Sequence, residues 1–362
     1  MKKLIETEEQ PKRAFLISLK GIDTNETFSA GELASLAETL GFEIAARETA
    51  AVKTLKPRYL LGTGKAAELA KKAGETGADC IVFDRDISPS QQRNWEDLAG
   101  IPVVDRQELI IQIFASRAQT REAVVQVELA RLAWSLPRLQ HRYIDLSRQR
   151  GGRYGTRGAG ETKLETDRRK VEQEIRSLRR QLEDIRRQRD IQQKQRVRQG
   201  IPLCAIVGYT NAGKSSLLNK FTGAPVFVED KLFATLDTTT RRFENGGRPF
   251  LLSDTVGFIR NLPHSLIDAF HSTLEEASRA DLLIHVLDVS DPEADACYET
   301  TRRVLQELGA EKIPVILALN KTDLLSADEL EAVCSRRPGS IPVSVKKSLG
   351  LDKLLAAINE II

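Results

Sequence analysis

The stretch that decides the fold is Leu203-Cys-Ala-Ile-Val-Gly-Tyr-Thr-Asn-Ala-Gly-Lys-Ser215. Its apolar start is typical of a buried parallel strand. The GxxxxGKS pattern that follows, Gly208 to Ser215, is found where a strand turns into a helix and backbone N–H groups surround phosphate oxygens. In such a loop Lys214 reaches the β- and γ-phosphates, and the Ser215 hydroxyl binds Mg²⁺. The pattern therefore predicts a nucleotide-binding P-loop followed by a helix at 217–221.

A second motif follows the next apolar strand, at 250–252. In Asp254-Thr-Val-Gly257 the carboxylate can hold the Mg²⁺ shell through a water, and the Gly257 N–H can meet the γ-phosphate. A loop with that contact reports whether the γ-phosphate is present. Phe258 then stands where many small GTPases carry a water-orienting Gln. We therefore expect slow unassisted hydrolysis, with help from another group, an ion or a partner.

A third motif, Asn320-Lys-Thr-Asp323, ends another apolar strand. The Asp323 carboxylate can accept hydrogen bonds from N1–H and N2–H₂ of guanine, whereas adenine would leave it unpaired. Asn320 is expected to brace the phosphate loop, and Lys321 to pack along the base. Ser344-Val-Lys346 follows a short strand and is expected to place backbone N–H groups near guanine O6. The three motifs, in this order, predict GTP binding.

A switch segment is expected between the first two motifs, at Phe233-Ala-Thr-Leu-Asp237 and the threonines after it. A threonine in such a segment completes the Mg²⁺ shell when the γ-phosphate is present. Position alone leaves four candidates open, namely Thr235, Thr238, Thr239 and Thr240.

Hydrophobic patterning divides the chain into three parts and predicts an α/β protein. Residues 1–105 are interpreted as a small α/β domain, with strands at 14–19, 78–83 and 101–104 and helices at 30–40 and 66–73. Residues 201–362 are interpreted as a P-loop G domain. Its strands are apolar throughout and predict a mainly parallel sheet, at 203–207, 250–252, 282–287 and 315–319.

The part between them, residues 106–200, has helical periodicity. Residues 107–136 are rich in helix formers, and apolar residues fall at heptad steps in both halves of the region. Two such helices predict an antiparallel hairpin. Its second helix, of about 35 residues, would be roughly 50 Å long, so the hairpin would project as an arm.

Charge is distributed unevenly along the chain. The formal net charge is +3, yet Arg138–Gly200 holds 19 Lys and Arg against 9 Asp and Glu, a local +10 that leaves −7 for the rest. Four arginines lie in the glycine-rich stretch at the predicted tip of the arm: Arg148, Arg150, Arg153 and Arg157. Guanidinium groups on flexible backbone suit irregular RNA. The alternative is a charged face that only keeps the arm soluble.

Together these motifs resemble one family, the HflX GTPases, which are ribosome-associated GTP-binding proteins. The likeness rests on GYTNAGKS, FATLD, DTVGFI, LPHSLIDAFHSTLEEA and NKTD, and on the glycine-rich signature at 158–169. The resemblance favours Thr235 as the switch threonine. It implies binding to the large (50S) ribosomal subunit and its rRNA, with a role in splitting or rescuing stalled ribosomes. Two positions depart from the family pattern, Thr238 where Pro is usual and Ser344-Val-Lys-Lys-Ser348 where Ser-Ala is usual.

Two shorter features each have two interpretations. Asn211 resembles the asparagine that holds K⁺ against the phosphates in potassium-dependent GTPases; otherwise it only tolerates a tight turn. Gly62-Thr-Gly-Lys65 is too short for a second P-loop, so a turn before the helix at 66–73 is favoured over an ATP site.

Composition excludes several classes of protein. No apolar run approaches the roughly 20 residues that span a bilayer, and the first residues lack the apolar core of a secretory leader. The four cysteines are far apart and form no CxxC pair, so neither disulfides nor a zinc site are expected. We expect a cytoplasmic protein that is a monomer when free. The alternative function is a GTP-controlled RNA chaperone or assembly factor. A membrane-recruited switch is disfavoured, because the basic stretch lacks an amphipathic face with exposed Phe or Trp.

The sequence thus predicts four sets of site residues. The catalytic set is Lys214, Thr235, Gly257 and Asn211, and the metal set is Ser215, Thr235 and, through a water, Asp254. The GTP-binding set is Gly208, Tyr209, Thr210, Asn211, Ala212, Gly213, Lys214, Ser215, Phe233, Ala234, Thr235, Leu236, Asp237, Asp254, Thr255, Val256, Gly257, Asn320, Lys321, Thr322, Asp323, Ser344, Val345 and Lys346. The RNA-binding set is the four arginines of the arm.

Overall fold

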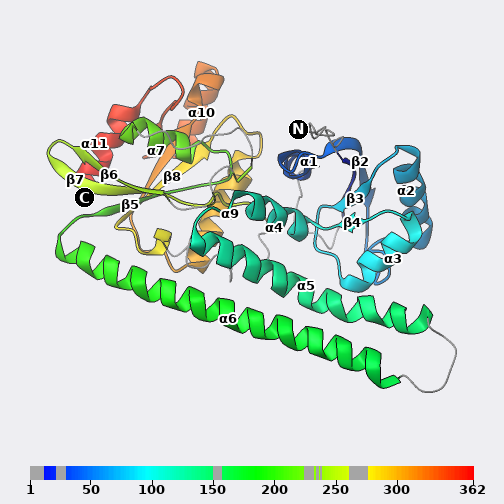
Figure 1. The fold of residues 1–362 in the computed structure, drawn as a ribbon. Coiled ribbons are helices and arrows are strands. Elements are labelled where there is room, and N and C mark those ends of the chain that lie inside the picture. Colours follow the sequence, from blue (N-terminus) through cyan, green and yellow to red (C-terminus); the bar gives the residue numbers. More distant parts are fainter. Residues whose placement is uncertain are drawn as a thin grey trace, which may run out of the picture. The chain divides into compact units, whose positions relative to one another are not determined.

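The structure is a computed structural model that describes residues 12–21, 30–149, 157–223, 232–233, 236, 239–260 and 276–362. The chain forms two compact units. Unit 1 comprises Met1–Ile113 and Trp134–Lys170, and unit 2 comprises Phe114–Ala133 and Val171–Ile362. Each unit contains a β-sheet whose strands are connected by helices, which confirms the predicted α/β class (Figure 1).

Unit 1 is built on a parallel sheet with the order β2-β1-β3-β4. Its strands are β1 (Arg13–Lys20), β2 (Glu43–Ala51), β3 (Cys80–Phe83) and β4 (Val103–Val104). The connecting helices are α1 (Ala30–Thr39), α2 (Thr63–Glu75) and α3 (Pro89–Ala99). The two central strands are nearly wholly buried, as their continuous apolar sequences require.

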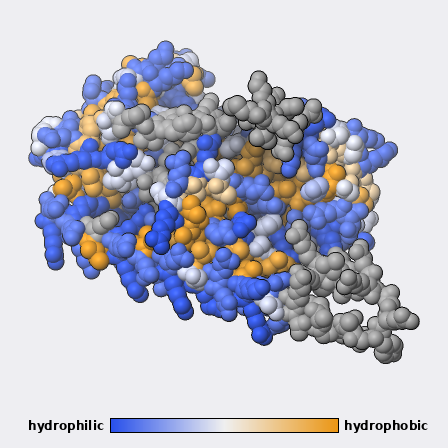
Figure 2. Space-filling model, viewed as in Figure 1, coloured by the Kyte–Doolittle hydropathy of each residue, from blue (hydrophilic) through white to orange (hydrophobic). Residues whose placement is uncertain are grey.

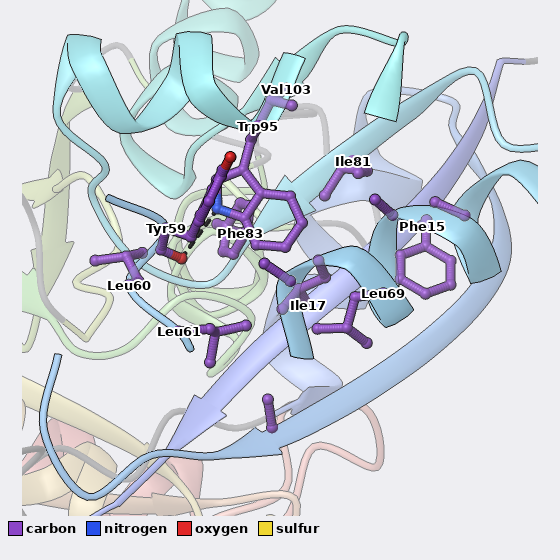
Figure 3. Close-up of a cluster of buried hydrophobic side chains, with 14 of the residues drawn as sticks. Phe15, Ile17, Tyr59, Leu60, Leu61, Leu69, Ile81, Phe83, Trp95 and Val103 are labelled. Atoms are coloured by element: carbon purple, nitrogen blue, oxygen red, sulfur yellow. Dashed lines mark hydrogen bonds between the residues drawn. The ribbon is translucent and has the colours of Figure 1, made fainter. Parts of the chain in front are cut away.

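The core of unit 1 is centred on Trp95 of α3 (Figure 3). Its ring meets Phe83 and Tyr59 edge-on, with centroids 5.1 and 5.8 Å away. The indole Nε1–H donates to the Tyr59 carbonyl oxygen at 3.0 Å, so the polar edge of the ring is satisfied inside the core. Ser88 caps α3 in a reciprocal capping box with Gln91, which fixes where this helix begins.

Two features of unit 1 differ from the sequence-based prediction. β2 was not predicted, because its sequence, EIAARETAA, is poor in β-branched residues; it is an edge strand whose residues are mostly half-buried or exposed. α2 begins at Thr63, so Thr63 to Lys65 form its first turn rather than a preceding loop. Lys65 there pairs with Glu68 one turn later, at 2.8 Å on the surface.

Unit 2 contains a six-stranded sheet with the order β10-β9-β8-β5-β7-β6. The strands are β5 (Leu203–Val207), β6 (Thr239–Asn245), β7 (Arg248–Asp254), β8 (Leu282–Asp288), β9 (Val315–Asn320) and β10 (Ile341–Pro342). The helices that connect or follow them are α7 (Lys214–Thr222), α9 (Ala294–Glu307), α10 (Ala327–Arg336) and α11 (Leu351–Ile361). The sheet is parallel except for β6, which confirms the predicted, mainly parallel arrangement.

β6 was not predicted either. It is a polar edge strand that pairs antiparallel with β7 through a two-residue turn at Gly246 and Gly247. Both glycines have positive φ angles, 60° and 79°, as a tight hairpin turn demands. The pair of glycines between two runs of strand-forming residues was the signal that could have identified this hairpin.

The middle of the chain forms three helices, α4 (Arg106–Arg117), α5 (Arg121–Gln149) and α6 (Arg157–Arg198). The single helix expected at 107–136 was wrong, because Thr120 interrupts it: its Oγ1 accepts a hydrogen bond from Ala123 N at 3.2 Å and caps α5. Asp105 caps α4 in the same way, through Glu108 N at 2.7 Å. α6 has 42 residues and is longer than the expected 35 or so, since it starts inside the glycine-rich stretch.

α5 and α6 contact each other as the predicted antiparallel hairpin. Glu122, near the start of α5, pairs with Arg189, near the end of α6, at 2.8 Å. Ile175 and Leu178 of the α6 heptad pattern are buried. In unit 2, Asp190 of α6 also pairs with Arg279 at 2.7 Å. The surface of α6 that Figure 2 presents is mostly hydrophilic, in keeping with its arginine- and glutamate-rich sequence.

Candidate functional site

The phosphate loop lies at the carboxyl end of β5, a central strand that pairs with β8 on one side and with β7 on the other. Two of its glycines have no room for a side chain. A Cβ on Gly208 (φ 149°) would lie 2.3 Å from the Val286 carbonyl oxygen, and one on Gly213 (φ 96°) would lie 2.3 Å from Asn320 Nδ2. α7 begins at Lys214, three residues earlier than predicted, so its N-terminus, with partial positive charge, lies at the loop.

Lys214 is buried beside the second motif. Its Nζ donates to the Tyr209 carbonyl oxygen at 2.7 Å. Burial lowers the pKa of this ammonium to about 8, and the Asp254 carboxylate opposes the shift. A Cβ on Gly257 would lie 2.9 Å from Thr210 Cα and 3.0 Å from Lys214 Nζ, so the close approach of the second motif to the phosphate loop favours glycine at this position.

Ser215 and Asp254 form the oxygen pair expected for a metal shell. Ser215 Oγ donates to Asp254 Oδ2 at 2.5 Å, and Asp254 is fully buried at the end of β7. A hydroxyl and a carboxylate are hard oxygen ligands of the kind that Mg²⁺ binds. The residues present therefore fit Mg²⁺ at the N-terminus of α7.

The second motif is hydrogen-bonded along the phosphate loop. Thr210 N donates to the Phe258 carbonyl oxygen at 2.8 Å, and Phe258 N donates to the Gly208 carbonyl oxygen at 3.1 Å. Arg260 N donates to the Tyr209 hydroxyl at 2.9 Å. The Phe258 ring is buried in an apolar core cluster that includes residues of β5 and β8. Its side chain therefore points into the core.

Asn320 joins the phosphate loop to the predicted guanine side. Its Nδ2 donates to the Ala212 carbonyl oxygen at 2.8 Å, and its Oδ1 accepts from Val345 N at 3.2 Å. Ser344 Oγ donates to Asp323 Oδ1 at 2.6 Å. This hydrogen bond holds the pKa of the Asp323 carboxyl below its ordinary value and so favours the charged, accepting form.

Lys321 and Thr322, between Asn320 and Asp323, are held by partners that sequence reasoning did not identify. Lys321 (φ 62°) pairs with Asp288 at 2.7 Å, and Thr322 Oγ1 donates to the Val343 carbonyl oxygen at 2.9 Å. The signal for Asp288 was an acidic residue ending an apolar strand. Lys346, the last residue of its predicted segment, is exposed.

The predicted switch segment is described only at Phe233 and Leu236, each 2% exposed. Ala234, Thr235, Asp237 and Thr238 lie outside the described residues. Phe233 has a φ of 55°, a left-handed conformation that costs a bulky residue of order 1–3 kcal/mol. Its ring meets Phe114 edge-to-face, with centroids 4.7 Å apart and planes at 89°. Such pairs contribute roughly 0.5–1.5 kcal/mol beyond the area they bury.

The two later threonines lie in β6. Thr239 is opposite Asp254, and Thr240 Oγ1 lies 3.1 Å from Ser253 Oγ. Ser253 Oγ in turn donates to Glu276 Oε2 at 3.0 Å. A buried serine thus links the start of β6 to the segment that resumes at residue 276. Sequence reasoning missed it; the signal was a polar residue within an otherwise apolar strand.

The predicted RNA-binding arginines are not described at the level of side chains. Arg150 and Arg153 lie outside the described residues, Arg148 is in the last turn of α5, and Arg157 begins α6. Among the described residues, no helix combines the length and the apolar character needed to cross a membrane.

Three protein-family models match consecutive parts of the chain. A GTP-binding GTPase N-terminal model matches residues 28–115, and a GTP-binding GTPase middle-region model matches residues 117–196. A model described as a 50S ribosome-binding GTPase matches residues 203–321. The match covers β5 to β9, the first two predicted motifs, and Asn320 and Lys321 of the third.

Comparison with individual proteins gives a consistent result. The chain is 47% identical over 374 residues to GTPase HflX of Akkermansia muciniphila, with 99% of this chain and 85% of that protein covered. It is 40% identical to GTPase HflX of Escherichia coli K12, with 96% and 82% covered. A crystal structure of SsGBP in complex with GDP is similar, with a TM-score of 0.52, 26% identity and coverage of 96% of this chain and 98% of that one. These matches confirm the resemblance drawn from the motifs: the chain belongs to the HflX family and is a GTPase that hydrolyses GTP.

Proposed function

We propose that this GTPase binds GTP and GDP with Mg²⁺ at the site around the phosphate loop, associates with the large (50S) ribosomal subunit, and acts in ribosome splitting or rescue or in ribosome biogenesis. The observation that carries the proposal is the Asn320 carboxamide, which connects the phosphate loop to the segment beside Asp323. The description of the model matched by residues 203–321, a 50S ribosome-binding GTPase, supports the ribosomal part.

On the phosphate side, each residue has a distinct role in the proposal. Mg²⁺, when bound, would neutralise charge on the β- and γ-phosphate oxygens. Ser215 and, through a water, Asp254 hold it, and Thr235 completes the shell in the GTP state. The lowered pKa of Lys214 rises again beside a phosphate, because an opposite charge favours the ammonium. The Gly257 N–H then senses the γ-phosphate.

On the base side, Asp323 selects guanine. Its ionised carboxylate accepts from N1–H and N2–H₂, and the hydrogen bond from Ser344 fixes the orientation of the carboxyl group. An adenine base would leave this acceptor unpaired at a cost that discriminates strongly. Lys321 packs along the base, and the segment from Ser344 to Lys346 contacts guanine O6.

Hydrolysis needs assistance in this proposal, because the buried Phe258 ring cannot orient a water. A ribosomal contact is one source of assistance. A K⁺ ion held by Asn211, which lies in the phosphate loop with a φ of 61°, is a second. Equal GTP turnover in K⁺ and Na⁺ would exclude a K⁺ ion as the source of assistance, and a ribosomal contact would then be the one that remains.

The three parts of the chain divide the work. Residues 1–105 form an N-terminal domain, 106–200 the arm and 201–362 the G domain. The arm contacts rRNA through Arg148, Arg150, Arg153 and Arg157, and the free protein is a cytoplasmic monomer. Replacing the four arginines by alanine should weaken large-subunit binding and flatten its salt dependence, since each lost phosphate contact removes about one unit from the slope. An unchanged salt titration would leave the arm without this role.

Sedimentation of intact ribosomes tests the outcome of binding. The protein is mixed with ribosomes and either GTP or GDP, and the ratio of free subunits to intact ribosomes is measured. A GTP-dependent rise in free subunits supports splitting or rescue. Binding to the large subunit without that rise favours the assembly role. No co-sedimentation with the large subunit in either nucleotide contradicts the proposal.

A further inference from the structure

We propose that Tyr209 is a positioning residue for GTP hydrolysis, whose side-chain hydroxyl keeps the Gly257 N–H at the phosphate loop by accepting a hydrogen bond from the backbone of Arg260. The phosphate-loop pattern uses residue 209 through its backbone and assigns no role to its side chain. The inference rests on the proposed function, in which the Gly257 N–H senses the γ-phosphate.

The first observation is how the second motif pairs with the phosphate loop. The parallel pairing of β5 with β7 reaches Ile206 and Asp254, and a further bridge joins Tyr209 to Phe258. Two residues separate the paired positions on the first strand and three on the second, so the second motif carries one extra residue there. An extra residue bends a strand locally. Gly257 lies in this interval, where its Cβ would be 2.9 Å from a backbone atom of the phosphate loop.

The second observation is the hydrogen bond beyond this interval. Arg260 N donates to the Tyr209 hydroxyl at 2.9 Å, and both residues are 8% exposed. A buried N–H that loses its acceptor is costly, so the hydroxyl holds the backbone at Arg260. Phe258 and Ile259, which connect Gly257 to Arg260, are each 1% exposed. Because this connection is packed in the interior, a restraint at Arg260 limits how far Gly257 can move.

The side chain of Arg260 provides a second, weaker restraint. Its Nη1 pairs with Glu293 Oε2 at 2.9 Å, at the residue that precedes α9. The Glu293 side chain is 42% exposed, so solvent screens this ion pair. The buried hydrogen bond to the Tyr209 hydroxyl is therefore the stronger of the two restraints.

The test is Tyr209→Phe in the full-length protein, which keeps the ring and removes the hydroxyl. The kcat for GTP hydrolysis should fall about fivefold, which corresponds to about 1 kcal/mol of lost transition-state stabilisation. The dissociation constant for GDP should be unchanged, because GDP has no γ-phosphate for the Gly257 N–H to meet. A loss of GDP affinity as large as the loss of kcat would mean that the phosphate loop itself is distorted, and would overturn the proposal.

A matched control is Thr301→Val. Thr301 is fully buried in α9, and its Oγ1 donates to the Cys297 carbonyl oxygen at 3.0 Å, so this variant also loses one buried hydroxyl in unit 2. Both variants should lower the melting temperature by a similar amount, about 2–4 °C, whereas kcat should be unchanged in the control. If Tyr209→Phe lowers kcat no more than Thr301→Val does, the hydroxyl only stabilises the fold and the proposal is wrong.

Amide hydrogen exchange locates the effect. In the GDP-bound protein, Tyr209→Phe should speed exchange in the peptide that covers residues 255–260, because the Arg260 N–H loses its acceptor and the backbone opens locally more often. Thr301→Val should leave exchange in that peptide unchanged. Full protection of the peptide in Tyr209→Phe would show that the hydroxyl does not hold this backbone.

Two further variants separate the alternatives. Glu293→Gln removes the charge that pairs with the Arg260 side chain and should lower kcat less than Tyr209→Phe does; a larger loss would assign the restraint to the ion pair and overturn the proposal. Lys214→Ala separates the role of Tyr209 from the proposed site. Retained hydrolysis in Lys214→Ala means that the proposed site is wrong, whereas inactive Lys214→Ala beside fully active Tyr209→Phe means that only the role of Tyr209 fails.

Discussion

Both sheets of this protein reverse their strand order near the centre, but different residues follow the strands at that point. In each, the strand order reverses beside a central strand, β1 and β3 in unit 1 and β5 and β8 in unit 2, which is where α/β sheets commonly bind ligands. In unit 2 the end of β5 runs into Gly208, whose φ of 149° and lack of a side chain let the backbone turn close to the Val286 carbonyl oxygen. In unit 1 the end of β3 runs into Asp84, whose Oδ2 accepts from Leu19 N of β1 at 2.9 Å.

The same contrast extends to the next strand of unit 1. Asp105, directly after β4, is 1% exposed and pairs with Arg138 of α5 at 2.7 Å. Carboxylates at these strand ends repel phosphate, and each accepts a hydrogen bond from a group of the same unit. Topology alone therefore does not make a phosphate site; the residues at the strand end decide whether one forms.

The largest expected difference between the two units is in the preference for GTP over ATP. Asp323→Ala removes the only acceptor proposed for guanine N1–H and N2–H₂, so the preference for GTP over ATP should fall by roughly 10⁴-fold. Competition binding with labelled GTP measures it. The control Asp84→Asn alters a buried carboxyl at a strand end of unit 1 and should leave the preference intact. A preference that survives in Asp323→Ala would mean that guanine is recognised elsewhere.

The next comparison is between Lys214 of the phosphate loop and Lys65 of the Gly62-Thr-Gly-Lys65 stretch in unit 1. Lys214→Ala removes the amine at the phosphate loop and should lower kcat roughly 10³-fold, the scale for losing one preorganised charge-stabilising group. Lys65→Ala removes a surface lysine of α2 and should change GTP turnover little. Loss of GTP hydrolysis in the Lys65 variant would give unit 1 a nucleotide role that its strand ends do not suggest.

The stability of unit 1 can be tested by removing the buried ion pair between Asp105 and Arg138. Arg138→Ala leaves the Asp105 carboxylate buried without its partner, which should cost about 3 kcal/mol of unfolding free energy. Denaturant unfolding followed by Trp fluorescence measures the loss, because Trp95 lies in the core of that unit. Arg131→Ala, which removes a surface pair with Glu128 on the same helix, is the control and should cost well under 1 kcal/mol. Equal losses of unfolding free energy in the two variants would show that the buried pair contributes no more to stability than the surface pair.

The smallest effect concerns pH. Burial, and then the nearby Asp105 charge, raise the pKa of Glu108 to about 7 from 4.5. The folded state therefore binds this proton more tightly than the unfolded state, so the contribution to stability is present below pH 4.5, falls as pH rises, and is lost above about 7. Glu108→Gln has no such dependence and should be more stable than the parent by of order 1–2 kcal/mol at pH 8 but not at pH 4.5. A parallel pH dependence of unfolding in both proteins would exclude Glu108 as the cause.

The sequence allowed the site to be predicted better than the edges of the fold. The phosphate loop, Asp254 and Asn320 each follow or end a short apolar run of the kind typical of a buried parallel strand, so their meeting at one sheet edge could be inferred. The strands β2 and β6 could not be, because edge strands carry polar residues and their pairing depends on partners distant in sequence. The break before α5 depended on the hydroxyl of Thr120, which helix periodicity does not register.

Contacts between segments distant in sequence were the other part that could not be predicted. Phe114 and Phe233 are both ordinary apolar residues, and no local pattern states that they meet. The roles of Ser253, Glu276 and Asp288 likewise depend on residues that are close in space but distant in sequence. Local motifs identify which residues are suited to phosphate and guanine, whereas the packing that holds them in place requires the structure.

The most direct test of the proposed function is GTP turnover by the purified protein with and without large ribosomal subunits. The buried Phe258 ring and the proposed ribosome association predict slow hydrolysis by the protein alone and a marked rise when large subunits are added. Lys214→Ala, measured alongside, should remain inactive in both conditions. Turnover that is unchanged by large subunits, with the parent protein folded and able to bind GTP, would contradict the account.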